Sequence, residues 1–198
     1  MPTVRYADGE SIMSRLNLLT SSVPASSAKR AFAWYLIAAS CAALLDTSSK
    51  MAAVQMLDAS SVSLGDRFAL MLVFNQGAVG GVSWGPHTWL INVCLTATAV
   101  TMISFIVVHL AKIDRRASLA LGLVAGGAAG NLASMLQGNG VPDFLALRFP
   151  DSAVVCNVAD LALWAGALML FPVVRTLLRA IRVERQAKVR LAAVLVNA

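Results

Sequence analysis

Charged side chains stand at the ends of long apolar stretches in this 198-residue sequence. Such groups are costly in or beside a bilayer, so they are the first candidates for function. Asp46 and Lys50 are four residues apart, which places them on one side of a helix, where they can neutralise each other. Direct contact with a substrate is the alternative interpretation of this pair.

Asp143 and Asp160 form a second candidate pair. Asp143 follows the third apolar stretch, and Asp160 lies near the start of the fourth. Two carboxylates in one site of low dielectric constant do not both ionise easily, so one keeps a proton while the other activates water. This pattern favours aspartic-protease chemistry. Spacing alone leaves helix capping and an ion pathway as alternatives.

The composition indicates that these residues are positioned by membrane-spanning helices. Hydrophobic residues make up 58% of the chain and charged residues only 13%, against about 25% charged in soluble domains. Stretches of about 20 apolar residues can span a bilayer. We predict an all-α integral membrane protein, a bundle of four transmembrane helices over about 31–56, 88–111, 117–135 and 157–174.

Glycine and basic residues add detail to this bundle. Gly122, Gly126 and Gly130 recur every four residues, which lines one helix face with glycine and permits close packing. Of the 16 Lys and Arg residues, 13 lie before the first span, between the second and third, or after the fourth. Basic residues accumulate on the cytoplasmic side, so both termini are expected there. The net charge of +6 is therefore explained by membrane topology and attraction to anionic lipid headgroups, so we expect membrane lipids and not nucleic acid as a partner.

The remaining segments divide the chain further. The apolar residues 68–74 end at Asn75, Gln76 and Gly77, which indicates a strand entering a turn and hence a small extracytoplasmic β element. The three cysteines are widely spaced, and no metal or cofactor motif is present, so neither is expected. We predict a cytoplasmic arm at 1–29, a four-span domain at 30–178 with extracytoplasmic segments 57–87 and 136–156, and a basic cytoplasmic tail at 179–198.

Five short motifs resemble those of the lipoprotein signal peptidases, also called signal peptidase II, over about residues 31–175. Each motif is weak alone, but all five occur in the family's order and on the expected sides of the spans. They are D-x-x-x-K at 46–50, F-N-x-G-A at 74–78, G-G-x-x-G-N at 126–131, V-x-D-F at 141–144 and N-x-A-D at 157–160.

The resemblance implies roles for particular residues. Asp143 and Asp160 match the catalytic aspartates of a membrane-embedded aspartic endopeptidase. Its substrates are diacylglyceryl-modified prolipoproteins, and it acts without a cofactor at the outer face of the bacterial cytoplasmic (inner) membrane. We expect a monomer. Helix capping remains an alternative for the asparagines. The residues implied to bind substrate or support the site are Asp46, Lys50, Asn75, Gly77, Asn131 and Asn157.

The chain also departs from the family pattern. Where the family continues G-N-x-x-D-R, this sequence has Ser134 and Met135, and Gly80 replaces a usual Phe. Loss of an acidic residue and an arginine together resembles removal of an ion pair as a unit, which can be nearly neutral. The departure leaves a second hypothesis, a non-catalytic homologue that binds signal peptides or peptide antibiotics in the same cleft. A small transporter or structural bundle would explain the four spans but not the five motifs.

Overall fold

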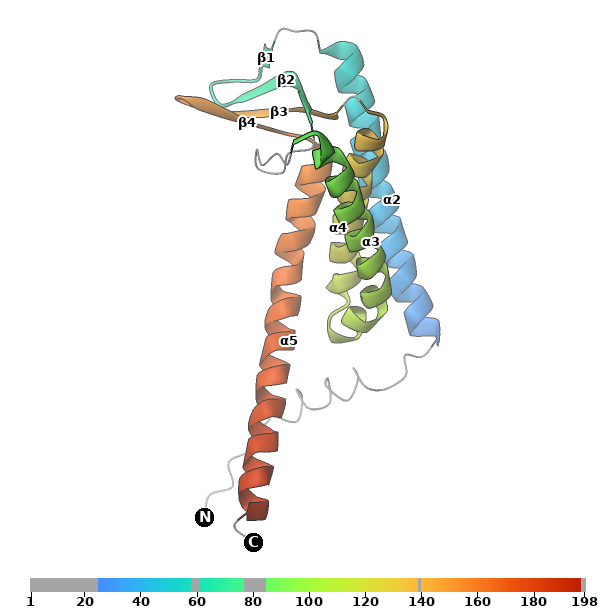
Figure 1. Ribbon diagram of the computed structural model, residues 1–198, viewed down its shortest axis with the longest axis vertical. Coiled ribbons are helices and arrows are strands. Elements are labelled where there is room, and N and C mark those ends of the chain that lie inside the picture. Colours follow the sequence, from blue (N-terminus) through green and yellow to red (C-terminus); the bar gives the residue numbers. More distant parts are fainter. Residues whose placement is uncertain (1–24, 58–60, 77–84, 139, 197–198) are drawn as a thin grey trace.

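Four long helices form the body of the protein in a computed structural model, which describes residues 25–57, 61–76, 85–138 and 140–196. Each helix is long and apolar enough to cross a membrane, which confirms the predicted four-helix membrane architecture. Many large apolar side chains on them are exposed, as expected for helices that face lipid. The helices are α2 (Ala25–Met56), α3 (Thr88–Ile113), α4 (Arg116–Leu136) and α5 (Val158–Val196) (Figure 1).

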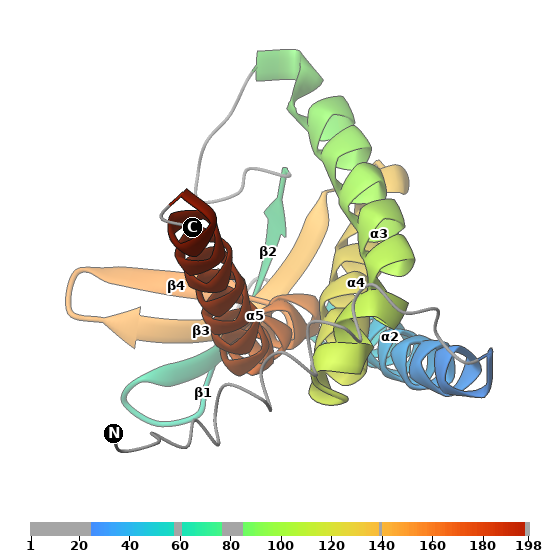
Figure 2. The same cartoon turned by 90° about the horizontal axis from the view of Figure 1, so that it is seen from below.

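The central helix is α4, which packs against α2, α3 and α5 (Figure 2). A Cβ atom added at Gly122 or Gly126 would collide with the backbone carbonyls of Tyr35 or Ala39 on α2. A Cβ atom at Gly127 would collide with the Ala159 carbonyl on α5. The glycine row predicted from the sequence therefore does allow close helix packing, as expected for helices without bulky residues at their interface.

A four-stranded antiparallel sheet lies at one end of the bundle and extends to one side of it (Figure 1, Figure 2). The predicted strand at 68–74 is confirmed as β2. No strand was predicted in 136–156, but this segment forms β3 and β4, with β3 between β2 and β4. The strands in order are β1 (Val62–Ser63), β2 (Phe68–Asn75), β3 (Val141–Phe149) and β4 (Ser152–Cys156), and the short 3-10 helix η2 (Gly85–His87) precedes α3.

The ends of the helices differ somewhat from the predicted domain limits. Helix α5 continues without a break past residue 178 to Val196, so the predicted tail is helical over most of its length. Helix α2 begins at Ala25, inside the predicted arm at 1–29. Residues 1–24 and the predicted turn residue Gly77, together with Gly80, lie outside the described residues. The division into arm, membrane domain and tail stays a prediction.

Basic residues gather at the end of the bundle that is opposite the sheet. Lys29 and Arg30 lie in the first turns of α2, and Arg115 and Arg116 lie where α3 connects to α4. Both places are at the lower end of the bundle in Figure 1, from which the C-terminal half of α5 extends further. Basic residues are therefore concentrated at one end of the bundle, and the sheet lies at the other end.

Candidate active site

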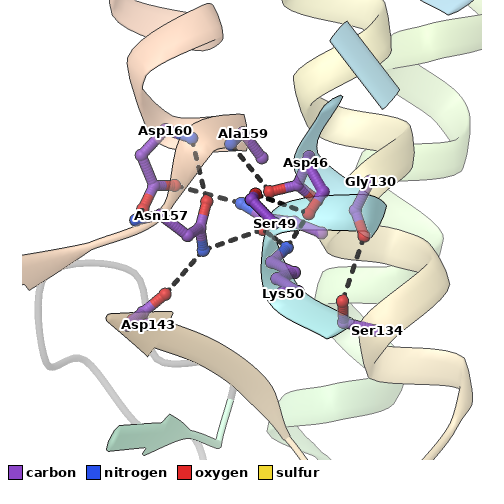
Figure 3. A network of polar contacts seen from close by, with 10 residues as sticks. Asp46, Ser49, Lys50, Gly130, Ser134, Asp143, Asn157, Ala159 and Asp160 are labelled. Atoms are coloured by element: carbon purple, nitrogen blue, oxygen red, sulfur yellow. Dashed lines mark hydrogen bonds and ion pairs between the residues drawn. The ribbon is translucent and has the colours of Figure 1, made fainter. Parts of the chain in front are cut away.

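The candidate site residues come together where the helices meet the sheet (Figure 3). They come from five different elements that are distant in the sequence, and Asn75 is the last residue of one of them, β2. Asp46 and Lys50 lie on α2, Asn131 on α4, Asp143 on β3, and Asn157 and Asp160 at the start of α5.

Asp46 and Lys50 form the ion pair that their spacing predicts. Lys50 Nζ lies 2.7 Å from Asp46 Oδ2, and both side chains are buried, with 5% and 0% of their surface exposed. The other oxygen, Asp46 Oδ1, accepts the backbone N–H of Ala159 at 2.8 Å. A buried charge needs such partners, because an unpaired one loses its hydration without compensation. The pair therefore joins α2 to the first turn of α5, and its contact with a substrate stays a prediction.

Gly130 makes room for the Asp46 carboxylate. A Cβ atom at this position would overlap Asp46 Oδ2 and would lie 3.0 Å from Asp46 Cγ. Gly130 thus leaves space for a site residue, whereas Gly122 and Gly126 allow α4 to pack closely against α2.

Asn157 and Asp160 cap helix α5 reciprocally. The Asn157 Oδ1 atom accepts the backbone N–H of Asp160 at 3.0 Å, and Asp160 Oδ2 accepts the backbone N–H of Asn157 at 3.1 Å. This is a capping box, which satisfies donors that a helix N-terminus leaves free. The capping alternative for these two residues is therefore confirmed. It does not exclude a chemical role, because Asp160 uses only one carboxylate oxygen for the cap.

Asp143 receives two side-chain amide donors. Its Oδ1 atom lies 2.5 Å from Asn157 Nδ2, and its Oδ2 atom lies 3.2 Å from Asn75 Nδ2. Burial is the main cause that raises the pKa of Asp143 above its ordinary value, and the charge of Asp160 acts in the same direction. The amide hydrogen bonds and Lys50 act in the opposite direction but do not cancel the effect. Asp143 thus holds a proton more tightly than an ordinary aspartic acid does.

Asn131 connects the ion pair to the two aspartates. Its Oδ1 atom accepts hydrogen bonds from Lys50 Nζ at 2.7 Å and from Asn157 Nδ2 at 3.1 Å. Its Nδ2 atom donates to Asp160 Oδ1 at 3.0 Å. Each aspartate therefore receives two N–H donors, and one continuous polar network joins three helices to the sheet.

Comparison with known proteins identifies the family. Residues 38–175, more than half of the chain, match the family described as Signal peptidase (SPase) II. The chain belongs to the signal peptidase II family. It is similar to proteins named lipoprotein signal peptidase in two bacteria. It is 39% identical to that of Pelotomaculum thermopropionicum over 64% of this chain and 82% of the relative, and 34% identical to that of Brevibacillus brevis over 69% and 91%.

Solved structures of bacterial membrane enzymes share the fold of this signal peptidase II family member. Two of them, at 2.3 and 1.9 Å resolution, each superpose with a TM-score of 0.62 and cover 71% of this chain. The superposition covers 86% and 91% of those chains, and the sequence identities are 20% and 18%. These similarities support the four-helix fold independently of the family assignment.

Ser134, one of the residues that depart from the motif pattern, has its hydroxyl hydrogen-bonded within its own helix. Its buried hydroxyl donates to the Gly130 carbonyl at 3.2 Å. Across the described part of the chain, no buried side-chain nitrogen or oxygen lacks a hydrogen-bond partner. Ser134 and Met135 therefore leave no buried polar side-chain atom unpaired in the described part of the chain.

Cys156 lies beside the site, although its position was not predicted to be a site position. It is the last residue of β4 and directly precedes the capping residue Asn157. Burial first, and then the charges of Asp160 and Asp143, raise the pKa of the Cys156 thiol. Its position next to the N-x-A-D motif was the available signal.

Proposed function

We propose that this protein is a membrane-embedded aspartic endopeptidase that removes signal peptides from diacylglyceryl-modified prolipoproteins. The observation that carries the proposal is that the carboxyl groups of Asp143 and Asp160, from β3 and α5, both contact Asn157. Asp143 accepts the Asn157 side-chain N–H, and Asp160 accepts the Asn157 backbone N–H. Membership in the signal peptidase II family and relatives named lipoprotein signal peptidase support the substrate class.

In the proposed reaction the two carboxyls share one proton. Asp143 starts protonated, in keeping with the direction of its pKa, and Asp160 starts as the carboxylate. Asp160 accepts a proton from water while the water oxygen attacks the peptide carbonyl carbon, and Asp143 gives its proton to the carbonyl oxygen. Collapse of the tetrahedral intermediate returns that proton to Asp143, and Asp160 protonates the leaving amine. The pair then regains its starting state.

The proposed location is the outer face of a bacterial inner membrane. Basic residues such as Lys29, Arg30 and Arg116 mark the opposite end of the bundle, and basic residues favour the cytoplasmic side. Both termini would then be cytoplasmic, and the sheet would lie at the outer boundary. A substrate with an apolar signal helix and acyl chains could reach this boundary without leaving the bilayer.

The test is cleavage of a lipidated prolipoprotein by the purified full-length protein in lipid vesicles. We expect the wild type to release the signal peptide, and Asp143→Asn or Asp160→Asn to reduce turnover by about a thousandfold or more. Asp151→Asn is the matched control, because Asp151 is exposed in the turn between β3 and β4. Turnover that is unchanged in the Asp143→Asn or Asp160→Asn variant would contradict the assignment.

A non-catalytic binder is the second candidate, and the presence of Ser134 and Met135 in place of Asp-Arg favours it. It predicts saturable binding of a labelled prolipoprotein with no product, under conditions in which a lipoprotein signal peptidase used as reference turns over. Binding without product would therefore replace the peptidase proposal by this one.

A further inference from the structure

The side-chain amide of Asn131 lies between an ammonium group and a carboxylate. Lys50 Nζ, which can only donate hydrogen bonds, lies 2.7 Å from Asn131 Oδ1. An amide carries its oxygen and its NH₂ group on opposite branches, so a fixed oxygen also fixes the nitrogen. That nitrogen donates to Asp160 Oδ1 at 3.0 Å.

Asn157 supplies a second constraint on the same amide. Its own oxygen must face the Asp160 backbone N–H at 3.0 Å, so its NH₂ group faces the other way. From there it donates to Asn131 Oδ1 at 3.1 Å. If the Asn131 amide were rotated by half a turn, its NH₂ group would face two other donors, Lys50 Nζ and Asn157 Nδ2. Its oxygen would then face the Asp160 carboxylate. Lys50 and Asn157 together thus exclude the reversed orientation.

We propose that Lys50 is a positioning residue for the aspartate pair and acts through Asn131. The ammonium group makes Asn131 present an N–H, rather than its carbonyl oxygen, to Asp160. Asp46 holds the ammonium group in place at 2.7 Å and also binds Ala159 in the first turn of α5. Lys50 is 4% exposed, so it acts on the chemistry through the Asn131 amide and through its charge on Asp143 rather than by contact with the substrate. The catalytic part of this inference rests on the proposed function.

Loss of the Lys50 ammonium group should change the pH dependence of turnover. Without the Lys50 donor, Asn157 is the remaining donor of the two that hold the Asn131 oxygen, so Asn131 presents its N–H to Asp160 less firmly. A carboxylate that loses hydrogen-bond support is protonated more easily. The titratable groups around Asp160 are Asp143 of β3, Cys156 of β4, and Asp46 and Lys50 of α2, whereas α4 contributes the uncharged Asn131. The base would then require a higher pH to become active.

A clean test must remove the ion pair as a unit. Replacing Lys50 alone would leave the buried Asp46 charge unpaired and would risk unfolding. The double variant Asp46→Asn/Lys50→Met keeps the net charge of the pair and an acceptor for Ala159. We expect kcat to fall roughly tenfold to a hundredfold with KM nearly unchanged. We expect the acidic limb of the kcat profile to move to higher pH, because Asp160 loses part of its hydrogen-bond support.

Two further variants serve as controls. Lys29→Met removes an exposed lysine at the opposite end of the same helix and should leave kcat and the pH profile at the wild-type values. Lys50→Arg retains a charged donor and should keep the acidic limb in place, even where its bulk lowers kcat. Thermal unfolding of each variant in detergent reports whether the fold is intact.

The decisive comparison uses an Asn131→Ala background. If Lys50 acts through Asn131, the double substitution should add little to the loss already caused by Asn131→Ala. Multiplicative losses, or a fall in kcat with the acidic limb unmoved, would show that the ion pair is structural only and would overturn the inference.

A measurement without turnover separates this inference from the proposed function. Infrared difference spectra with and without Asp160→Asn identify the carboxyl band of Asp160. In the Asp46→Asn/Lys50→Met protein this band should persist to a higher pH than in the wild type. An unchanged titration would contradict the positioning role, whereas absence of cleavage by the wild type would contradict only the peptidase proposal.

Discussion

Asn157 donates a side-chain N–H to the Asp143 carboxylate across 2.5 Å, although the same side chain also caps helix α5. The amide oxygen of Asn157 caps the helix, and its amide nitrogen donates to Asp143 in the site. A substitution that keeps an oxygen but removes the nitrogen can therefore separate the effect on stability from the effect on activity.

The variants Asn157→Ser and Asn157→Ala should differ in stability but not in activity. Serine is a good N-cap, so Asn157→Ser should change the free energy of unfolding by less than about 0.5 kcal/mol, while Asn157→Ala should lower it by about 1 kcal/mol. Both lose the donor to Asp143, so both should lose turnover by roughly tenfold to a hundredfold. Denaturation in detergent and cleavage assays measure the two effects. Wild-type turnover in Asn157→Ser would show that the amide donor is dispensable.

The variant Gly130→Ala should destabilise the protein, contrary to the usual effect of this substitution in a helix. Alanine normally stabilises a helix by about 0.5–1 kcal/mol relative to glycine. Here the new Cβ would overlap the Asp46 carboxylate, and such overpacking costs about 1–3 kcal/mol. The melting temperature of the variant relative to the wild type shows whether the substitution stabilises or destabilises the protein. The control Ala133→Ser, at an exposed position of the same helix, should have little effect. Stabilisation by Gly130→Ala would mean that Asp46 does not contact this face.

The variant Asp143→Asn should change how stability depends on pH. Folding raises the pKa of this carboxyl above its ordinary value of 3.8, so the folded wild type holds the proton more tightly than the unfolded chain. The resulting contribution to stability is complete below the ordinary pKa and is lost as the pH rises through the folded pKa. The Asp143→Asn variant has no such proton to lose. The melting temperature of the variant minus that of the wild type should therefore become more positive as the pH rises above about 4. A difference that does not vary with pH would contradict a raised pKa.

Cys156 should report on the charge of the aspartate pair. In a Cys41→Ala/Cys94→Ala protein it is the remaining one of the three cysteines. Its raised pKa lowers the thiolate fraction, so maleimide should label it more slowly at neutral pH than it labels a free peptide cysteine. Asp160→Asn removes the larger of the two charges that raise the pKa and should accelerate labelling, whereas Asp151→Asn should not. Equal rates in the Asp160→Asn and Asp151→Asn proteins would place the Asp160 charge too far away to act.

The helical part of the fold was predictable from the sequence, because a bilayer imposes a simple rule. A span needs about 20 apolar residues, and the four predicted stretches correspond to α2, α3, α4 and α5 within a few residues at most ends. The i, i+4 spacing likewise predicted the ion pair of Asp46 and Lys50, since both members lie on one helix. Such features depend only on neighbours in the chain.

The sheet was only partly predictable. Strand β2 is a continuous apolar run, but β3 contains Pro142 and Asp143, residue types that are depleted in strands. Its strand conformation follows from pairing with β2 on one side and β4 on the other, and β2 lies about 70 residues away along the chain. Strand propensity depends only on the residues of β3 itself, so it cannot indicate that β2 is available as a pairing partner.

The sequence by itself determined the candidate residues, the four spans and the family resemblance, because apolar length, charge asymmetry and short motifs are local properties of the chain. The tertiary structure decided which atom of each residue faces which. The Asn131 amide is oriented by Lys50 from another helix, and the Asp143 carboxylate is buried by elements that precede and follow it. Hydrogen-bond direction and desolvation depend on atoms that only folding brings together, so the proton-holding carboxyl and the positioning lysine emerged from the structure alone.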